Sequence, residues 1–213
     1  MKIKQTKDHV KKILQERVSG FDWWHTYRVW MSAKKIAKDA DMEIVELASL
    51  LHAVPDWKFG KYKIEDIRIW LNSIDVEESK IKKICFIVEN IEFNGENEHN
   101  KITSVEGKIV QDADWLDAIG AIGIARGFMF AGSKNLPMYI PDTPYEKGMK
   151  RDEYRNTNRK NYSQINHFHE KLLLIKDRLH TDEAREIAKP RHEFLEQFLK
   201  QFASEWIKEN ILE

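Results

Sequence analysis

The sequence contains few of the residues that are abundant in disulfide-bonded or irregular proteins. Its 213 residues include one cysteine, Cys85, with five prolines and nine glycines. A single thiol excludes a disulfide scaffold and a four-thiolate metal site, and it suits a reducing compartment. The low glycine and proline content excludes collagen-like and low-complexity chains. We therefore expect a folded cytoplasmic protein.

Net charge and long apolar runs are also missing. The 35 basic and 35 acidic residues cancel, so nothing favours bulk attraction to nucleic acid or to a membrane. The most apolar stretch, 118–132, is shorter than the ~20 residues that a bilayer requires and contains Arg126. The charged first residues lack the apolar core of a signal peptide. We expect 118–132 to be a buried helix packed through Gly120 and Gly123.

The apolar residues recur at helical spacing along most of the chain. No alternating run is long enough to predict a strand, so the predicted fold class is all-α, with a single domain over residues 1–213. Two polar loops, 92–101 and 134–150, are long enough to be lids or substrate walls. The spacing predicts helices around residues 10–18, 29–37, 47–51, 64–71, 81–88, 172–179 and 194–206.

Local signals predict where helices begin and end. Asp22 is a plausible N-cap for the second helix. Thr103 with Glu106 has the spacing of a capping box. Pro55 should end or bend the helix before it, and Pro190 should separate the last two helices.

Three histidine contexts carry potential chemistry. His25 lies in DWWHTYRVW at the start of a predicted helix, and His52 follows the apolar run ELASLL. An imidazole at the end of such a run is either a hydrogen-bonded core residue or a ligand. His167 and His169 are two residues apart on a predicted helix, so at most one of them faces a given site.

The acidic candidates lie together in VQDADWLDAIG. Asp112 precedes an apolar helix, where it is either an N-cap or a metal ligand. Asp114 and Asp117 are three residues apart and share one helix face. His25, His52 and Asp112 would come from three separate helices, and this ligand set suits Mn, Fe, Ni or Zn with water positions left open.

Four longer strings carry a family resemblance: HTYRV, LLHAVPDWKFG, GKIVQDADWLDAIGAIGIAR and NHFHEKLLLIKDRL. Together they resemble the HD-domain phosphohydrolase superfamily, and in particular its small bacterial branch of nucleotide pyrophosphohydrolases. The resemblance covers roughly residues 9–202. It implies an all-helical fold that hydrolyses nucleoside triphosphates, deoxy forms included, to a monophosphate and pyrophosphate.

The resemblance also implies a divalent metal, manganese or else magnesium, iron, nickel or zinc. The family holds it with a first His, a His-Asp pair and a later Asp, which correspond here to His25, His52 with Ala53, and Asp112. Ala53 stands where the family has an aspartate, and a methyl group cannot bind a metal. We therefore expect weak metal binding and low or absent activity. The alanine is either a deliberate change of an active-site residue or a natural feature of a degenerate member or subtype.

The remaining site predictions concern acid/base chemistry and phosphate. Asp56 follows His52 by four residues and is a candidate general acid/base, or else an aspartate facing a loop. Phosphoryl chemistry needs cations near the transferring group. Each candidate side chain could instead be a solvated surface charge. The family resemblance favours Lys171 most. The candidate cations are Arg28, Lys58, Arg126 and Lys171.

The expected partner is a nucleotide, with neither a membrane nor a nucleic acid, and a homodimer stays open. Trp24, Trp57 and Phe59 could stack on a base or could belong to the core. Two other functions stay open: a non-catalytic nucleotide-binding module, which Ala53 favours, and an HD phosphohydrolase acting on another phosphate ester.

Overall fold

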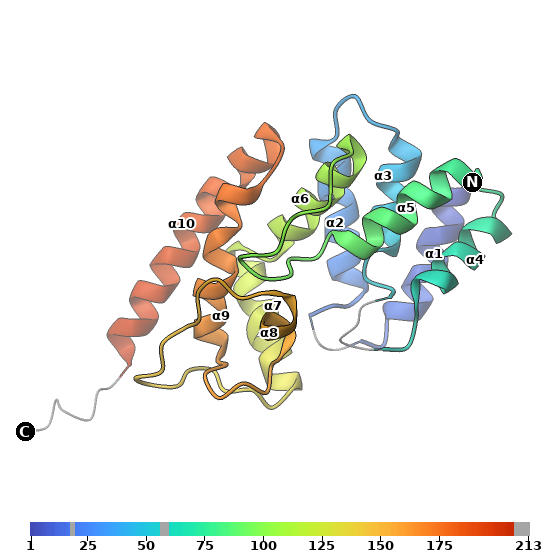
Figure 1. Ribbon diagram of the computed structural model, residues 1–213. Helices are drawn as coiled ribbons and strands as arrows, with labels where there is room; N and C mark the ends of the chain where they lie inside the picture. The colour runs from blue at the N-terminus through green and yellow to red at the C-terminus, as the bar shows by residue number, and fades with distance from the viewer. Residues whose placement is uncertain (18–19, 56–59, 207–213) are drawn as a thin grey trace, which may run out of the picture.

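The computed structural model describes residues 1–17, 20–55 and 60–206. These residues form α-helices and short 3₁₀ helices without a strand, which confirms the all-α prediction (Figure 1). The predicted helix at 172–179 is replaced by two 3₁₀ helices, η1 and η2. The elements are α1 (Lys2–Leu14), α2 (Trp23–Ile36), α3 (Met42–Leu51), α4 (Ile64–Ser73), α5 (Glu78–Asn90), α6 (Val105–Asp117), α7 (Gly120–Ser133), α8 (Arg151–Arg155), α9 (Gln164–Glu170), η1 (Leu172–Leu174), η2 (Lys176–Arg178) and α10 (Asp182–Glu205).

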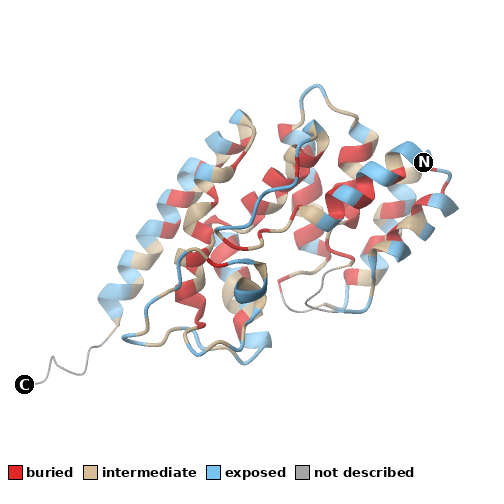
Figure 2. Cartoon of the chain, in the orientation of Figure 1, coloured by how far each residue is buried: buried red, intermediate tan, exposed pale blue. Residues whose placement is uncertain are grey.

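Helix α2 lies in the middle of the molecule and packs against α3 and α6. Figure 1 shows α1, α4 and α5 on one side of this centre, with α7, α9 and α10 on the other. A continuous apolar core extends from Val10 in α1 to Leu195 in α10. Its buried residues are concentrated in the central helices, whereas the far end of α10 is largely exposed (Figure 2). The central helices therefore supply a rigid frame on which functional side chains can be positioned.

The two predicted helix starts differ in outcome. Asp22 caps α2 as predicted, because its carboxylate accepts a hydrogen bond from the backbone N–H of His25 at 2.9 Å. The capping box of Thr103 and Glu106 is wrong by one residue. Ser104 is the N-cap of α6, and its hydroxyl accepts from a backbone N–H three residues further on. Thr103 and Ser104 can both act as caps, so the sequence alone did not separate them.

The prediction that Pro190 separates two helices is wrong, because α10 continues through it. A proline removes one backbone hydrogen bond and introduces a steric clash. Here the buried side chains Ala184, Ala188, His192 and Leu195 keep helical spacing on both sides of the proline. Packing of this stripe against the core offsets the local cost, as tertiary contacts commonly do.

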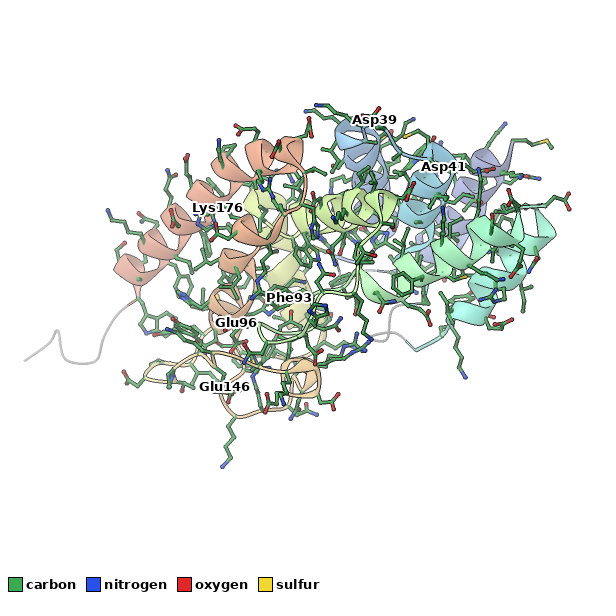
Figure 3. All side chains as sticks on the ribbon, turned by 45° about the horizontal axis from the view of Figure 1, so that its top comes forward. Asp39, Asp41, Phe93, Glu96, Glu146 and Lys176 are labelled. Carbon is green, nitrogen blue, oxygen red and sulfur yellow. The ribbon has the colours of Figure 1, made fainter. Side chains whose placement is uncertain are left out.

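The two predicted loops lie against each other. The backbone N–H of Asn97 donates to the carbonyl of Met149 at 3.2 Å. The backbone N–H of Gly148 donates to the Glu96 carboxylate at 2.7 Å. Figure 3 labels Glu96 on the first loop and Glu146 on the second. The two loops are therefore joined by hydrogen bonds. Glu92 and Phe93 of the first loop line the cavity described below, whereas no residue of 134–150 is among its lining residues, so the wall interpretation stays a prediction for the second loop.

The apolar stretch 118–132 forms most of α7, and only one face of it is buried. An added Cβ at Gly120 would lie 3.0 Å from the Arg191 side chain of α10, so close packing through this glycine is confirmed, whereas the nearest atom at Gly123 is the carbonyl oxygen of Ala118 in the same stretch, at 2.2 Å. Ile122 and Met129 are exposed, so the expectation of a fully buried helix is wrong. Of the helices described, none is by itself long and apolar enough to cross a membrane, and α6 with α7 reaches that length only as a pair bent by 75°.

Candidate active site

His25 is fixed at the start of α2 in a defined tautomer. Its Nδ1 lies 2.8 Å from a carboxylate oxygen of Asp117, at the end of α6. Burial alone would raise the pKa of Asp117, but the hydrogen bonds from His25 and Arg28 hold it well below its ordinary value. The ionised carboxylate can only accept, so Nδ1 of His25 carries the proton and Nε2 keeps its lone pair.

His52 is fixed in the same tautomer by a backbone group. It is the C-cap of α3, and its Nδ1 donates to the carbonyl oxygen of Ser49 at 2.7 Å. Its Nε2 lies 3.0 Å from Nε2 of His25. Burial, with the neighbouring charge of Arg126, lowers the pKa of His25 well below its ordinary value. Burial thus favours the neutral ring of His25, whose Nε2 lone pair is then able to bind a cation.

Asp114 completes a set of three converging atoms. Its Oδ1 lies 3.5 Å from Nε2 of His25 and 3.6 Å from Nε2 of His52. These atoms form the potential metal-binding group found among the described residues. Metal bonds of about 2.0–2.2 Å to imidazole and carboxylate require donor atoms roughly 3–3.5 Å apart, so the three residues fit a divalent ion. Two imidazoles and one carboxylate suit Mn, Fe, Ni or Zn.

Ala53 lies beside these donors. It is buried, lines the same cavity as His25 and Asp114, and its carbonyl accepts from Arg17 at 2.9 Å. The backbone at this position is thus held in place by a side chain from the segment after α1. Because the methyl group offers no donor atom, His25, His52 and Asp114 are the candidate protein ligands among the described residues.

Asp112 requires a correction. Its carboxylate is fully buried and accepts from the backbone N–H groups of His180 and Thr181, at 2.9 and 2.8 Å, and from the Thr181 hydroxyl at 2.8 Å. It therefore anchors the start of α10 and lies away from the histidine pair. Residues two apart on a helix point in nearly opposite directions. Asp114, rather than Asp112, lies beside the two histidines. It shares one helix face with Asp117, as the sequence spacing indicated.

Arg28 and Arg126 were predicted to contact phosphate, but both guanidinium groups bind other groups of the protein. Arg28 donates to both carboxylate oxygens of Asp117, at 2.7 and 3.0 Å. Arg126 is buried, donates to the carbonyl of Gly20 at 2.6 Å and lies 3.0 Å from the Asp117 carboxylate. Arg126 does border the cavity. Both guanidinium groups hold Asp117 ionised and so support the orientation of His25.

Lys171 also lies on the cavity wall, with its ammonium 5.8 Å from the centre of the Phe93 ring. Trp24 is 61% exposed and so does not belong to the core. Asp56, Lys58, Trp57 and Phe59 lie outside the described residues.

The cavity extends from the histidines to residues that the sequence analysis did not single out. Its wall includes aromatic side chains from α7 and from the segment before α9, together with Gln164 at the start of α9. His167 also lines it, whereas His169 stacks on Tyr145 with ring centres 4.7 Å apart, which confirms that the two histidines diverge. No sequence motif marked Gln164. Gln164 reaches the cavity because α9 packs against α7, and the sequence did not predict this contact.

Comparisons with known proteins find relatives over nearly the whole chain. No protein-family model matches the chain. The uncharacterized protein YpgQ of Bacillus subtilis is 37% identical over 203 residues, covering 92% of this chain and 90% of YpgQ. The crystal structure of YpgQ in complex with ADP superposes with a TM-score of 0.73 at 33% identity, over 95% of this chain and 96% of that one.

Two further solved structures extend the likeness. A protein from Lactobacillus plantarum has a TM-score of 0.88 at 31% identity, over 96% of each chain. An HD-superfamily hydrolase from Bacillus thuringiensis has a TM-score of 0.70 at 38% identity, again over 96% of each chain. The chain is thus more than 30% identical to an HD-superfamily hydrolase over nearly its whole length. It also brings two histidines and an aspartate together, as described above. On these grounds the chain belongs to the HD-superfamily hydrolases.

Proposed function

We propose that this chain is a divalent-metal-dependent phosphohydrolase that cleaves nucleoside triphosphates, deoxy forms included, to a monophosphate and pyrophosphate. The observation that carries the proposal is the pair of Nε2 lone pairs on His25 and His52, 3.0 Å apart beside Asp114. The ADP complex of the relative YpgQ supports a nucleotide as the substrate class.

The protein groups have separable roles in this proposal. His25, His52 and Asp114 hold the ion, which when bound supplies positive charge to the phosphoryl group and acidifies a water molecule. Asp117 holds the His25 ring in the required tautomer. Lys171, on the cavity wall, is placed to bind a phosphate oxygen. Asp56 is the proposed acid/base that takes the proton from the attacking water.

The proposed reaction joins a water oxygen to the α-phosphorus and breaks the bond between that phosphorus and the bridging oxygen of the β-phosphate. Pyrophosphate leaves with that oxygen. Ala53 weakens the site because one anionic ligand is lacking relative to the family pattern. We therefore propose manganese, or one of the other ions named above, as a weakly bound cofactor with low turnover in the chain as it stands.

The test restores the carboxylate. Ala53→Asp should bind Mn²⁺ more tightly by calorimetry and should release pyrophosphate from a deoxynucleoside triphosphate, whereas the present chain releases little. Release of orthophosphate would move the attack to the γ-phosphorus. Equal Mn²⁺ affinity in the two proteins would show that position 53 does not face the ion.

A second function is favoured by Ala53 itself. A site that keeps its cavity while lacking one ligand could serve a non-catalytic nucleotide-binding protein. The same experiment separates the two functions, because such a protein binds the triphosphate and releases neither pyrophosphate nor orthophosphate after Ala53→Asp.

A further inference from the structure

Gln164 presents a buried amide to the cavity without a protein partner. The residue is 0% exposed, and neither its Nε2 nor its Oε1 forms a hydrogen bond with any described residue. Buried amides nearly always find partners, because an unmet donor or acceptor keeps its full desolvation cost. Gln164 also lines the cavity that contains His25 and His52. The missing partner is therefore expected inside the cavity.

The surrounding backbone holds Gln164 in place and leaves room for its amide. Gln164 is the first residue of α9, and its backbone N–H donates to the carbonyl of Pro137 at 3.0 Å. Across from it, an added Cβ at Gly127 of α7 would lie 2.3 Å from the amide nitrogen. Any side chain at position 127 would thus push the amide away, so the glycine makes this placement possible.

The cavity that Gln164 borders has aromatic side chains in its wall. Phe130 of α7 and Tyr162 line the same cavity, as does Tyr154. Phe130 contacts Phe21 edge-on, with ring centres 5.6 Å apart. Aromatic faces stack on nucleobases of any identity. A planar amide pairs in plane with a neighbouring donor and acceptor, as in its recognition of base edges.

We propose that Gln164 binds the edge of the nucleobase and so determines that a base, rather than a bare polyphosphate, occupies this end of the cavity. The inference rests on the proposed nucleotide function and deepens it. Every base offers an adjacent donor and acceptor. The amide can present its two atoms in either order because no protein bond fixes them. The structure thus assigns to Gln164 a preference for nucleotides with tolerance among the bases.

The test compares three probes on the full chain with excess Mn²⁺: a nucleoside triphosphate, ribose 5-triphosphate and inorganic tripolyphosphate. Affinities are measured by calorimetry for the parent and for Gln164→Met, which has a similar length and no hydrogen-bonding group. We expect the substitution to weaken nucleoside triphosphate binding by roughly 5- to 150-fold, the span for loss of a bidentate amide–base pair. Binding of the other two probes should change less than about twofold.

Two further proteins keep the result interpretable. Gln201→Met, at an exposed position near the end of α10, is the matched control and should leave all three affinities unchanged. If Gln164→Met does not fold, Gly127→Ala displaces the amide without removing it and should lower nucleotide affinity in the same selective way. The four bases should bind the parent within about tenfold of one another, since the pairing is not base-specific.

Several outcomes would overturn the inference. Unchanged nucleotide affinity in Gln164→Met would mean that water satisfies the amide. An equal loss for ribose 5-triphosphate would assign the amide to the sugar, and an equal loss for tripolyphosphate would assign it to phosphate. The outcome is independent of turnover: base-selective binding that depends on Gln164 would stand even if Ala53→Asp released no pyrophosphate.

Discussion

The two ends of the cavity are built differently. At the histidine end, formed by His25, His52 and Asp114, each imidazole has a protein partner on its far side. At the amide end, Gln164 has no partner among the described residues. The first end is organised for an ion before any ligand arrives, whereas the second is completed by what binds there. Preorganised groups of the first kind support catalysis, and unmet polar groups of the second kind support recognition.

The largest effect should come from removing Asp114, which would break the histidine end. In the Ala53→Asp background, Asp114→Asn removes the carboxylate of the present chain that approaches both Nε2 atoms. We expect Mn²⁺ affinity to fall by more than about 100-fold, beyond the 10- to 100-fold span for groups that only orient ligands. Turnover should be lost with it. Calorimetry and pyrophosphate release measure the two effects.

Asp112→Asn is the matched control, two residues away on the same helix. It should leave Mn²⁺ affinity unchanged and should lower the free energy of unfolding by about 1–3 kcal/mol, because a buried charge-assisted cap of α10 is weakened. Urea unfolding measures this loss. If Asp112→Asn instead reduced metal affinity as strongly as Asp114→Asn, the assignment of Asp114 as the ligand would fail.

A smaller effect should follow from disturbing the support behind His25. Asp117→Asn offers an amide in place of the ionised acceptor and leaves the paired charges of Arg28 and Arg126 without their anion. We expect a 10- to 100-fold loss of Mn²⁺ affinity, the usual span for such second partners of metal-binding histidines. Retention of full affinity would show that His25 is oriented by packing alone.

The smallest effect should come from Lys171, which lines the same cavity. In the Ala53→Asp background, Lys171→Met should mainly weaken nucleotide binding, by roughly tenfold, because the ammonium meets phosphate in the ground state as well as in the transition state. The KM of this variant for the nucleotide should rise with little change in kcat. A loss of stability without a kinetic effect would place Lys171 in a structural role with Phe93.

Much of the fold could be predicted from local pattern. Helices α2 to α5 follow the apolar spacing, and the cap at Asp22 was evident because a single short side chain precedes the helix. The wrong prediction at Pro190 has a tertiary cause. Pro190 breaks a local rule, and packing of Ala188 and Leu195 on either side compensates for it. Such compensation depends on neighbours distant in sequence, which periodicity does not reveal.

The candidate site shows the same difference between what local sequence predicted and what tertiary packing decided. The sequence by itself determined the helical class, because helical periodicity is a local property of the chain, and its resemblance to the HD-domain phosphohydrolases pointed to His25 and His52 as candidate ligands. Only the tertiary structure selected Asp114 over Asp112, since the two differ in which neighbouring helix their carboxylates reach. It also decided that Arg28 supports Asp117 and that Gln164 lies in the cavity without a hydrogen-bond partner among the described residues, because partners and burial exist only once the helices have packed.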